Sequence, residues 1–382
     1  MLKRLTAVLT AMLLTLATYA FAAELRGDHP STYTVQKGDT LWDISAKFLA
    51  KPWLWPEIWQ ANPQVKNPHR IYPGDVLSLV YVNGQPRLTS SVEGPQIRTG
   101  EAIETIPLSE IEPWLKQLTI VQDPKSFPYV VGLEEDRLMS TSGQVAYVRG
   151  MTGARPGQKV QIARPVSLYG MNRPNKRGFR TGGTTPLDFR ADRLHEHWTF
   201  GSWTNGEGRT EAWGEKFGYE MMLHSIGEVT RIQGDITIVL LQTEGRDVRV
   251  GDRVLPVEER PYCNCFSPHP ATSIAPGAQI LNVADGLKFS GPRMVVALSV
   301  GSRDGVDNGT VYSMWHDGAI RPDIVRNRNN IAAHHDRIAM PDDYLGHLMV
   351  FRTFDKVSYA LVMDAIRPAR VGDLLKHPDA VE

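Results

Sequence analysis

The sequence lacks an excess of charge of either sign. Its 382 residues hold 42 Lys and Arg against 42 Asp and Glu. Removal of the first 22 residues deletes Lys3 and Arg4 but no acidic residue. The remaining chain then has 40 basic residues against 42 acidic ones. Both nucleic acid and anionic lipid attract a basic surface, so binding through bulk charge is excluded for either. We expect partners to be recognised by local contacts.

Long apolar runs are confined to the N-terminus. Residues 5–19 are largely apolar, Lys3 and Arg4 precede them, and Ala20-Phe21-Ala22 follows the small-x-small rule for cleavage. The run is too short for a stable membrane span. The pattern predicts a secretory signal peptide over 1–22, with an uncleaved anchor as the alternative. No cysteine near Ala23 would accept a lipid, and no later segment approaches 18 apolar residues, so we expect no insertion into the membrane.

Cysteine is scarce, and the only two are Cys263 and Cys265. They could be a nucleophile, a metal clip or a disulfide, although a bridge across one residue is strained. An intermolecular bridge is a further alternative, and the sequence leaves the choice open. A cysteine peptidase or an L,D-transpeptidase would also need an upstream His motif and a following Gly or Ser framework, and neither is present.

Motifs of other hydrolases are also missing. The chain has no Glu-Ser pair of the lytic transglycosylase kind and no Gly-x-Ser-x-Gly elbow. His195-Glu196-His197 and His334-His335-Asp336 could supply zinc ligands, but the His-then-Asp motif of a zinc endopeptidase is not visible. The simpler interpretation is that these histidines lie in exposed loops and are not zinc ligands. We therefore predict no catalytic site, no metal and no cofactor.

The most informative stretch runs from residue 33 to residue 80. A short strand at 33–35 leads through a Gly38-Asp39 turn to Thr40, an N-cap with Asp43 as the acidic member of a capping box. Pro52 ends the first helix, Pro56 suits the first turn of a second, and a turn at 71–75 leads into a closing strand at 76–80. The order is strand, helix, helix, strand in about 50 residues, which gives a core of marginal size.

This stretch resembles the LysM module, a family that binds the N-acetylglucosamine-containing glycan of peptidoglycan or chitin. The family's marks are YxVxxGDTLWxIA and NPxxIYPGxxL, and the chain reads YTVQKGDTLWDIS from Tyr33 and NPHRIYPGDVL from Asn67. The link at residues 51–56 is longer and more aromatic than is usual in the family. The resemblance implies a βααβ fold and glycan binding.

A neutral glycan offers hydroxyls and acetamido groups but no charge. Two Gly-containing turns that expose backbone N–H and C=O groups could bind an acetamido group, while an aliphatic side chain covers its methyl. The alternative is that both turns are mere connections. The predicted glycan-binding residues are Gly38, Asp39, Thr40, Leu41, Asn67, Pro68, Ile71, Tyr72, Pro73 and Gly74.

Four tryptophans lie in the same stretch, at positions 42, 53, 55 and 59. They could stack on sugar rings. A module this small needs large apolar side chains to close its core, however, so core packing is the favoured interpretation for each of them.

Residues 83–108 are polar and rich in Gly and Pro, which is typical of a linker. Ser109 to Glu112 reads as a capping box that starts a short helix. From about Val121 the chain shows short segments of period two bounded by turn residues, which predicts antiparallel strands. Residues 246–255 return in altered form at 367–375, so we expect two barrel-like β units in tandem, with the Gly-Asp pairs as hairpin turns.

Residues 169–218 interrupt this pattern with many Gly and Arg residues and little periodicity. A loop of this length inside a domain is usually functional or disordered. Arg and Trp are favoured at interfaces, so a partner contact and plain disorder are both open here. The predicted domains are 32–82 for the module, 83–108 for the linker, 109–265 for the first β unit with insertion 169–218, and 266–382 for the second.

Several segments after the linker resemble the LysM-containing type IV pilus secretin-associated proteins, whose C-terminal part is similar to the C-terminal domain of the flagellar assembly protein T. They include Val250-Gly251-Asp252-Arg253-Val254 and the run from Val350 to Val362. Membership would imply a non-enzymatic periplasmic protein that anchors the outer-membrane secretin to peptidoglycan. Many copies around a ring would add avidity. The alternatives are an adaptor that recruits or regulates a wall hydrolase and a hydrolase with an unrecognised site.

Overall fold

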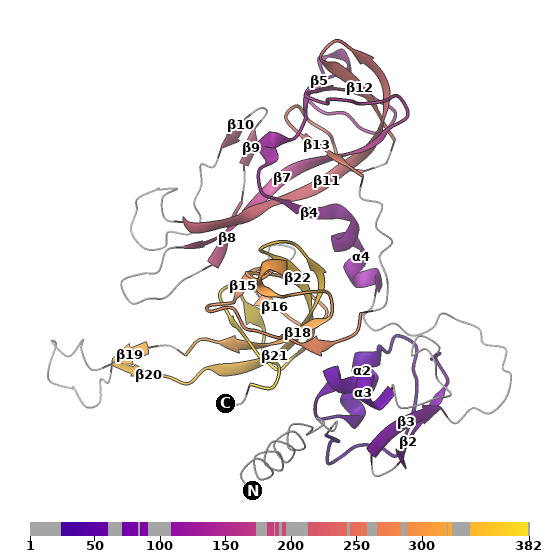
Figure 1. Ribbon diagram of the computed structural model, residues 1–382, viewed down its shortest axis with the longest axis vertical. Helices are drawn as coiled ribbons and strands as arrows, with labels where there is room; N and C mark the ends of the chain where they lie inside the picture. The colour runs from indigo at the N-terminus through magenta and orange to yellow at the C-terminus, as the bar shows by residue number, and fades with distance from the viewer. Residues whose placement is uncertain are drawn as a thin grey trace, which may run out of the picture. The chain divides into compact units, whose positions relative to one another are not determined.

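The structure is a computed structural model of the whole chain (Figure 1). It describes residues 24–59, 71–82, 85–90, 108–172, 182–186, 188–190, 193–195, 213–242, 245–257, 266–283, 289–318, 320–322 and 337–380. The chain divides into two compact units. Unit 1 comprises Met1–Pro107 with Asn264–His269, and unit 2 comprises Leu108–Cys263 with Pro270–Glu382. The predicted signal peptide and both cysteines lie outside the described residues.

Unit 1 contains the predicted strand, two helices and closing strand. β1 (Thr32–Thr34) pairs antiparallel with β2 (Val76–Val82), and α2 (Leu41–Phe48), the 3-10 turn η1 (Pro52–Leu54) and α3 (Trp55–Trp59) lie between them in the chain. Leu41, Ile44 and Phe48 share the buried face of α2 and pack with Ile58 and Leu77. The βααβ prediction is confirmed.

A third strand, β3 (Gln85–Ser90), was not predicted. It pairs with β2 from Leu77↔Ser90 to Val82↔Gln85, and its Leu88 side chain belongs to the core of the module. The sequence assigned these residues to a linker because Gly84 and Pro86 interrupt the pattern. An N-terminal segment also adds to the core: Leu25 packs on it, and Arg26 N–H donates to the carbonyl of Phe48 over 2.9 Å.

Unit 2 is mainly antiparallel β structure, as predicted. It opens with α4 (Leu108–Gln117), so Ser109 lies inside the helix rather than before it. An eight-stranded sheet follows, in the order β4-β11-β12-β6-β5-β13-β7-β8, and β7 also pairs with β11. Its strands are β4 (Leu118–Val121), β5 (Tyr129–Leu133), β6 (Val145–Arg149), β7 (Lys159–Asn172), β8 (Gly182–Pro186), β11 (Trp213–Gln233), β12 (Ile236–Leu241) and β13 (Arg253–Pro256).

A seven-stranded sheet is formed by later strands of the chain. Its order is β14-β18-β21-β22-β17-β15, and β24 pairs with β18. The strands are β14 (His269–Pro270), β15 (Ile280–Val283), β17 (Val295–Leu298), β18 (Thr310–His316), β21 (Asp343–Thr353), β22 (Ser358–Ala365) and β24 (Leu374–Lys376). The structure thus shows antiparallel sheets with few helices, and the barrel-like form of the two β units stays a prediction.

Three short strand pairs and three 3-10 turns complete the described elements of unit 2. The pairs are β9 (Asp188–Arg190) with β10 (Arg193–His195), β16 (Phe289–Ser290) with β23 (Ala369–Arg370), and β19 (Ile320–Pro322) with β20 (Arg337–Ala339). The turns are η3 (Pro124–Ser126), η4 (Glu134–Asp136) and η7 (Ser302–Asp304). The predicted insertion 169–218 therefore supplies β8, β9 and β10, and its two ends belong to β7 and β11.

The repeated Gly-Asp pairs are turns, but they are not hairpins. Gly251 and Gly372 both have φ of 93°, and the carboxylate that follows each glycine accepts a backbone N–H three residues earlier, over 2.8 Å from Arg249 and 2.7 Å from Arg370. The glycine N–H donates to a strand far away in sequence, at Val130 or Ile280. Each turn therefore enters a strand instead of joining two adjacent ones.

Buried polar contacts tie the two sheets of unit 2 together. The Glu220 carboxylate on β11 accepts hydrogen bonds from the hydroxyls of Tyr169 on β7 (2.6 Å) and Tyr359 on β22 (2.7 Å), and all three side chains are buried. Burial, followed by the Glu220 charge, holds the pKa of Tyr169 well above 10, so its hydroxyl stays a donor. Arg352 on β21 donates to the carbonyls of Trp114 and Leu115 near the end of α4 and of Leu118 at the start of β4.

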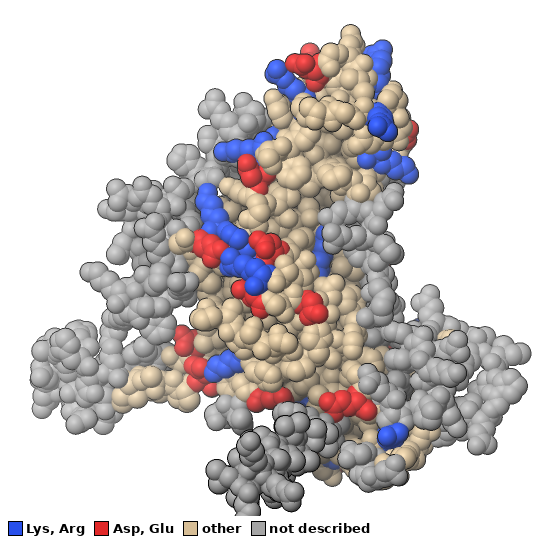
Figure 2. Space-filling model, viewed as in Figure 1, with Lys and Arg blue, Asp and Glu red and all other residues tan. Residues whose placement is uncertain are grey.

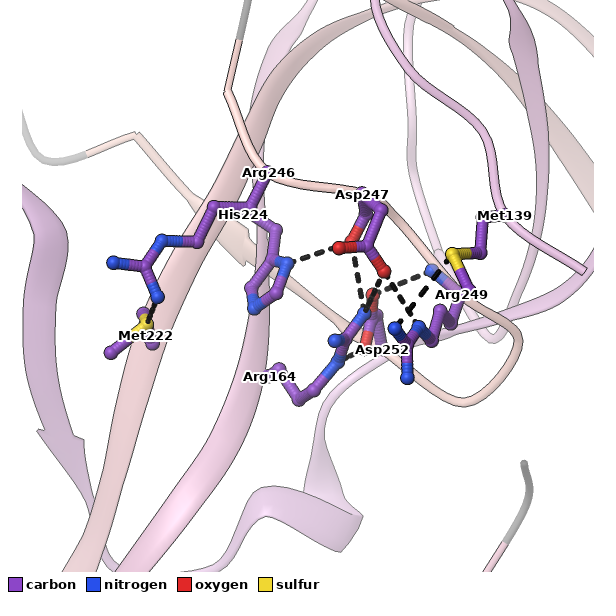
Figure 3. Close-up of polar contacts among 8 residues, drawn as sticks. All are labelled: Met139, Arg164, Met222, His224, Arg246, Asp247, Arg249 and Asp252. Carbon is purple, nitrogen blue, oxygen red and sulfur yellow. Dashed lines mark hydrogen bonds and ion pairs between the residues drawn. The ribbon is translucent and has the colours of Figure 1, made fainter. Parts of the chain in front are cut away.

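A second polar cluster lies in the first sheet (Figure 3). Arg164 on β7 and the fully buried Asp252 form a two-point ion pair, with Nε–Oδ1 and Nη2–Oδ2 distances of 2.8 and 2.9 Å. The same guanidinium donates to the carbonyl of Asp247 over 2.9 Å. Nδ1 of the buried His224 also lies 2.7 Å from that carbonyl, so Nδ1 is the donor.

The His224 environment predicts a loss of stability in mild acid. Burial, followed by the positive charge of Arg164, lowers the pKa of His224 from 6.5. The unfolded state then binds more protons than the folded state below that pH, so the stabilising contribution is present above about 6.5 and is lost as pH falls towards the lowered pKa. We expect the melting temperature of unit 2 to fall between about pH 7.5 and 5.5.

Calorimetry of three chains tests the origin of this fall. His224→Asn keeps a donor but cannot be protonated, so its melting temperature should depend less on pH in this window. His377→Asn, a change at a histidine of unit 2 whose side chain is 43% exposed, should leave the dependence intact. An equal fall in the His224→Asn and unsubstituted chains would contradict the assignment.

Candidate glycan-binding site

The first predicted turn is shaped by Gly38. It lies in the left-handed region, with φ of 94°, and the Asp39 N–H donates to the Gln36 carbonyl over 3.2 Å. The Asp39 carboxylate accepts from Gln36 N–H and from the Tyr33 hydroxyl, each over 2.8 Å. Burial, followed by this bond to Asp39, raises the pKa of Tyr33 to about 12. Asp39 is thus held as part of the turn.

Thr40 and Leu41 follow as the start of α2. The Thr40 hydroxyl accepts from Asp43 N–H over 3.1 Å, and the Asp43 carboxylate accepts from Thr40 N–H over 3.2 Å. The predicted capping box is therefore present. The side chains of Thr40 and Leu41 are buried, at 5% and 2% exposure, so they can offer a ligand little more than backbone atoms.

The second predicted turn runs from Tyr72 to Asp75. Asp75 N–H donates to the Tyr72 carbonyl over 3.0 Å, and the Asp75 carboxylate accepts from Tyr72 N–H over 3.0 Å. Pro73 at the second position and Gly74 at the third, with φ of 96°, are typical of a type II turn. Pro73 and Gly74 are exposed, Tyr72 is half-buried, and the side chain of Ile71 is buried in the core.

Val35 joins the two turns. Gly74 N–H donates to its carbonyl over 2.8 Å, and its own N–H donates to the Asp75 carbonyl over 2.9 Å. Because Gln36 follows Val35 directly, the Gly38 turn and the Gly74 turn lie side by side, as predicted. A Cβ built on either glycine would meet nothing within 4 Å, so a ligand could approach both backbones. Asn67 and Pro68 lie outside the described residues.

The described side chains of three of the four tryptophans are buried. Trp42, Trp53 and Trp55 are 2%, 3% and 5% exposed, and the rings of Trp42 and Trp53 have centroids 6.4 Å apart. The preference for core packing over sugar stacking is confirmed for these three, while the side chain of Trp59 is not described. The aliphatic cover expected for an acetamido methyl is not supplied by Leu41 or Ile71, because the core takes both side chains.

The described residues hold no group of three or more His, Cys, Asp or Glu side chains that could bind a metal ion. Of the histidine candidates, His195 ends β10, and His197 and the His334-His335-Asp336 cluster lie outside the described residues. A pocket of about 160 Å³ in unit 2 is lined by apolar residues such as Leu115, Phe127, Met221 and Leu255 together with polar ones such as Arg352, and its lining includes no Asp, Glu or His. It offers no acid or base for hydrolysis.

Two comparisons place the N-terminal module. The model of the family described as LysM domain matches residues 33–80. This region is a LysM domain. The LysM match supports binding of peptidoglycan, whose N-acetylglucosamine units are the expected ligand.

Two relatives are similar over this domain. An uncharacterized protein YqbP of Bacillus subtilis (strain 168) is 40% identical over 60 residues, which cover 13% of this chain and 27% of the relative. The potassium binding protein Kbp of Escherichia coli O6:H1 is 46% identical over 48 residues, or 12% and 32% of the two chains. The chain spans less than a third of each relative's length. The resemblance of the later residues to secretin-associated proteins stays a prediction.

Proposed function

We propose that the protein is a non-enzymatic periplasmic anchor that holds the outer-membrane secretin of a type IV pilus to peptidoglycan. The LysM domain is the wall-binding part. The observation that carries this role is the pair of Gly turns on either side of Val35, both open to an approaching ligand. They present backbone N–H and C=O groups, which suit an uncharged acetamido group.

The charge distribution agrees with recognition by local contacts. On the face shown in Figure 2, Lys and Arg lie among Asp and Glu and form no patch of one sign among the described residues. A neutral glycan and a protein partner are compatible with such a surface, whereas nucleic acid would favour a basic one.

The packing of unit 2 suits a part that transmits load. Glu220 is bonded to tyrosines from both sheets, and Arg352 fixes α4 to the second sheet. The Glu215 carboxylate on β11 adds ion pairs with Arg303 and Lys356, the latter over 3.2 Å. Several independent polar contacts resist separation better than one. A force applied at α4 would therefore be transmitted to both sheets.

Recovery of the partner tests the proposal. The fragment from Ser109 to Glu382, tagged and exported, serves as bait in detergent-solubilised envelopes, and bound proteins are identified by mass spectrometry. We expect the outer-membrane secretin. A wall hydrolase without the secretin would replace this function with that of an adaptor, and a zymogram on purified sacculi would reveal hydrolysis by the protein itself.

A further inference from the structure

The connection between β5 and β6 displays apolar side chains that its own fold does not cover. We call residues 134–139 of this connection the knob. Leu138 is 85% exposed and the next residue, Met139, is 49% exposed. Leu138 has the largest exposed fraction of any large hydrophobic side chain in the described part of the molecule. An exposed leucine contributes no burial free energy to folding. A partner that covers Leu138 would gain that free energy on binding.

The backbone of the knob is strained. Glu135 and Asp136 have φ of 56° and 52°, and Arg293 is the one other non-glycine residue with positive φ among those described. Such conformations cost on the order of 1 kcal/mol or more each and persist only where neighbouring contacts impose them. Two in succession turn the chain sharply just before Leu138.

Contacts on both sides hold this shape. The Arg137 guanidinium donates to the Glu135 carboxylate over 2.6 Å, and the Glu134 carboxylate accepts from Val145 N–H over 3.3 Å. After the knob, Ser140 and Val248 exchange backbone hydrogen bonds of 3.0 and 2.9 Å. Figure 3 shows the Met139 sulfur against the Arg249 guanidinium, 3.7 Å from its Nη2. The knob is thus fixed at both ends while Leu138 projects from it.

The charge of the knob limits what can cover it. It begins with three consecutive acids, Glu134, Glu135 and Asp136. Arg137 forms an ion pair with Glu135, and within the described residues Glu134 and Asp136 form none. A complementary surface would therefore combine an apolar socket with a rim of Lys or Arg. Lipid tails and neutral glycan do not offer this combination.

We propose that the knob docks into a folded protein partner with an apolar socket edged by basic residues. This inference rests on the proposed function, in which that partner is the secretin, and it names the contacting surface. Leu138 is the central apolar contact and Met139 adapts to the socket wall. The carboxylates of Glu134 and Asp136 attract the basic rim and so orient the knob as it approaches the socket.

The test measures binding of the full processed chain to purified, detergent-solubilised secretin. We expect Leu138→Ser to weaken the affinity about tenfold or more, as loss of a central apolar contact does. Ile366→Ser is the matched control, because Ile366 is 71% exposed but lies just after β22 in the second sheet. It should bind like the unsubstituted chain. Circular dichroism checks that both variants fold.

Salt dependence gives a second readout. Asp136→Asn removes a charge while Asn still tolerates positive φ, so it should reduce the loss of affinity that added salt causes. If the unsubstituted chain binds and Leu138→Ser binds equally well, the knob is not the contact and the proposed function stands. If the unsubstituted chain does not bind the secretin, both the proposed function and the knob assignment are wrong.

Discussion

Replacing Arg164 with Ala is expected to lower the free energy of unfolding of unit 2 by about 3–5 kcal/mol. The Asp252 carboxylate has no exposed surface, and the Arg164 side chain is 11% exposed. Removing the guanidinium leaves a buried negative charge without its two-point partner at 2.8 and 2.9 Å. It also removes a donor to the Asp247 carbonyl. Most of this loss of stability comes from the buried Asp252 carboxylate, which is left without its cationic partner.

The matched control is the exposed Arg–Asp pair of the same sheet. Arg149 lies 3.7 Å from Asp235, with side chains 55% and 82% exposed, so Arg149→Ala should change stability by no more than about 0.5 kcal/mol. Hydrogen exchange in urea, followed on peptides from β7 and β13, measures both variants without interference from unit 1. The double variant Arg164→Ala with Asp252→Asn should recover part of the loss. Equal costs for Arg164→Ala and Arg149→Ala would show that burial does not govern this pair.

Gly74→Trp is expected to abolish sedimentation of the protein with peptidoglycan sacculi. The space in front of Gly74 is open, so an indole there would cover the backbone that the glycan needs. The substitution also forces a non-glycine residue to φ of 96°, at a cost of about 1–3 kcal/mol. Circular dichroism must therefore accompany the binding assay.

Gly27→Trp serves as the comparison. Gly27 is also an exposed glycine of unit 1, and a Cβ built on it would meet nothing within 4 Å. It lies outside the two turns. It should bind sacculi normally. A folded Gly74→Trp protein that still sediments would remove the Gly74 turn from the site.

Local patterns predicted local structure well. Thr40 with Asp43 gave the helix start, Pro52 and Pro56 separated the helices, and the motif residues gave the two turns of the LysM domain. These features depend on neighbours within a few residues. Strand β3 was missed for the converse reason: Leu88 is buried through its pairing partner on β2, while its own neighbours are polar or turn-forming.

Contacts between distant residues could not be predicted. Glu220 lies between apolar residues in a long strand, and nothing near it indicates that Tyr359, 139 positions away, donates to it. Arg164 and Asp252 are 88 positions apart, so the Gly-Asp pair was interpreted as a turn alone. The exposure of Leu138 likewise depends on where the folded chain leaves it. The two turns, which have local signatures, were therefore predicted, and the exposed Leu138 was not.

The most direct test of the account is sedimentation of the unsubstituted, processed chain with purified sacculi, in the presence and absence of soluble N-acetylglucosamine oligomers. The account predicts that the protein sediments with the sacculi and that the oligomers release it. Protein that stays in the supernatant, or that sediments equally with and without the oligomers, would contradict recognition of the glycan by the LysM turns.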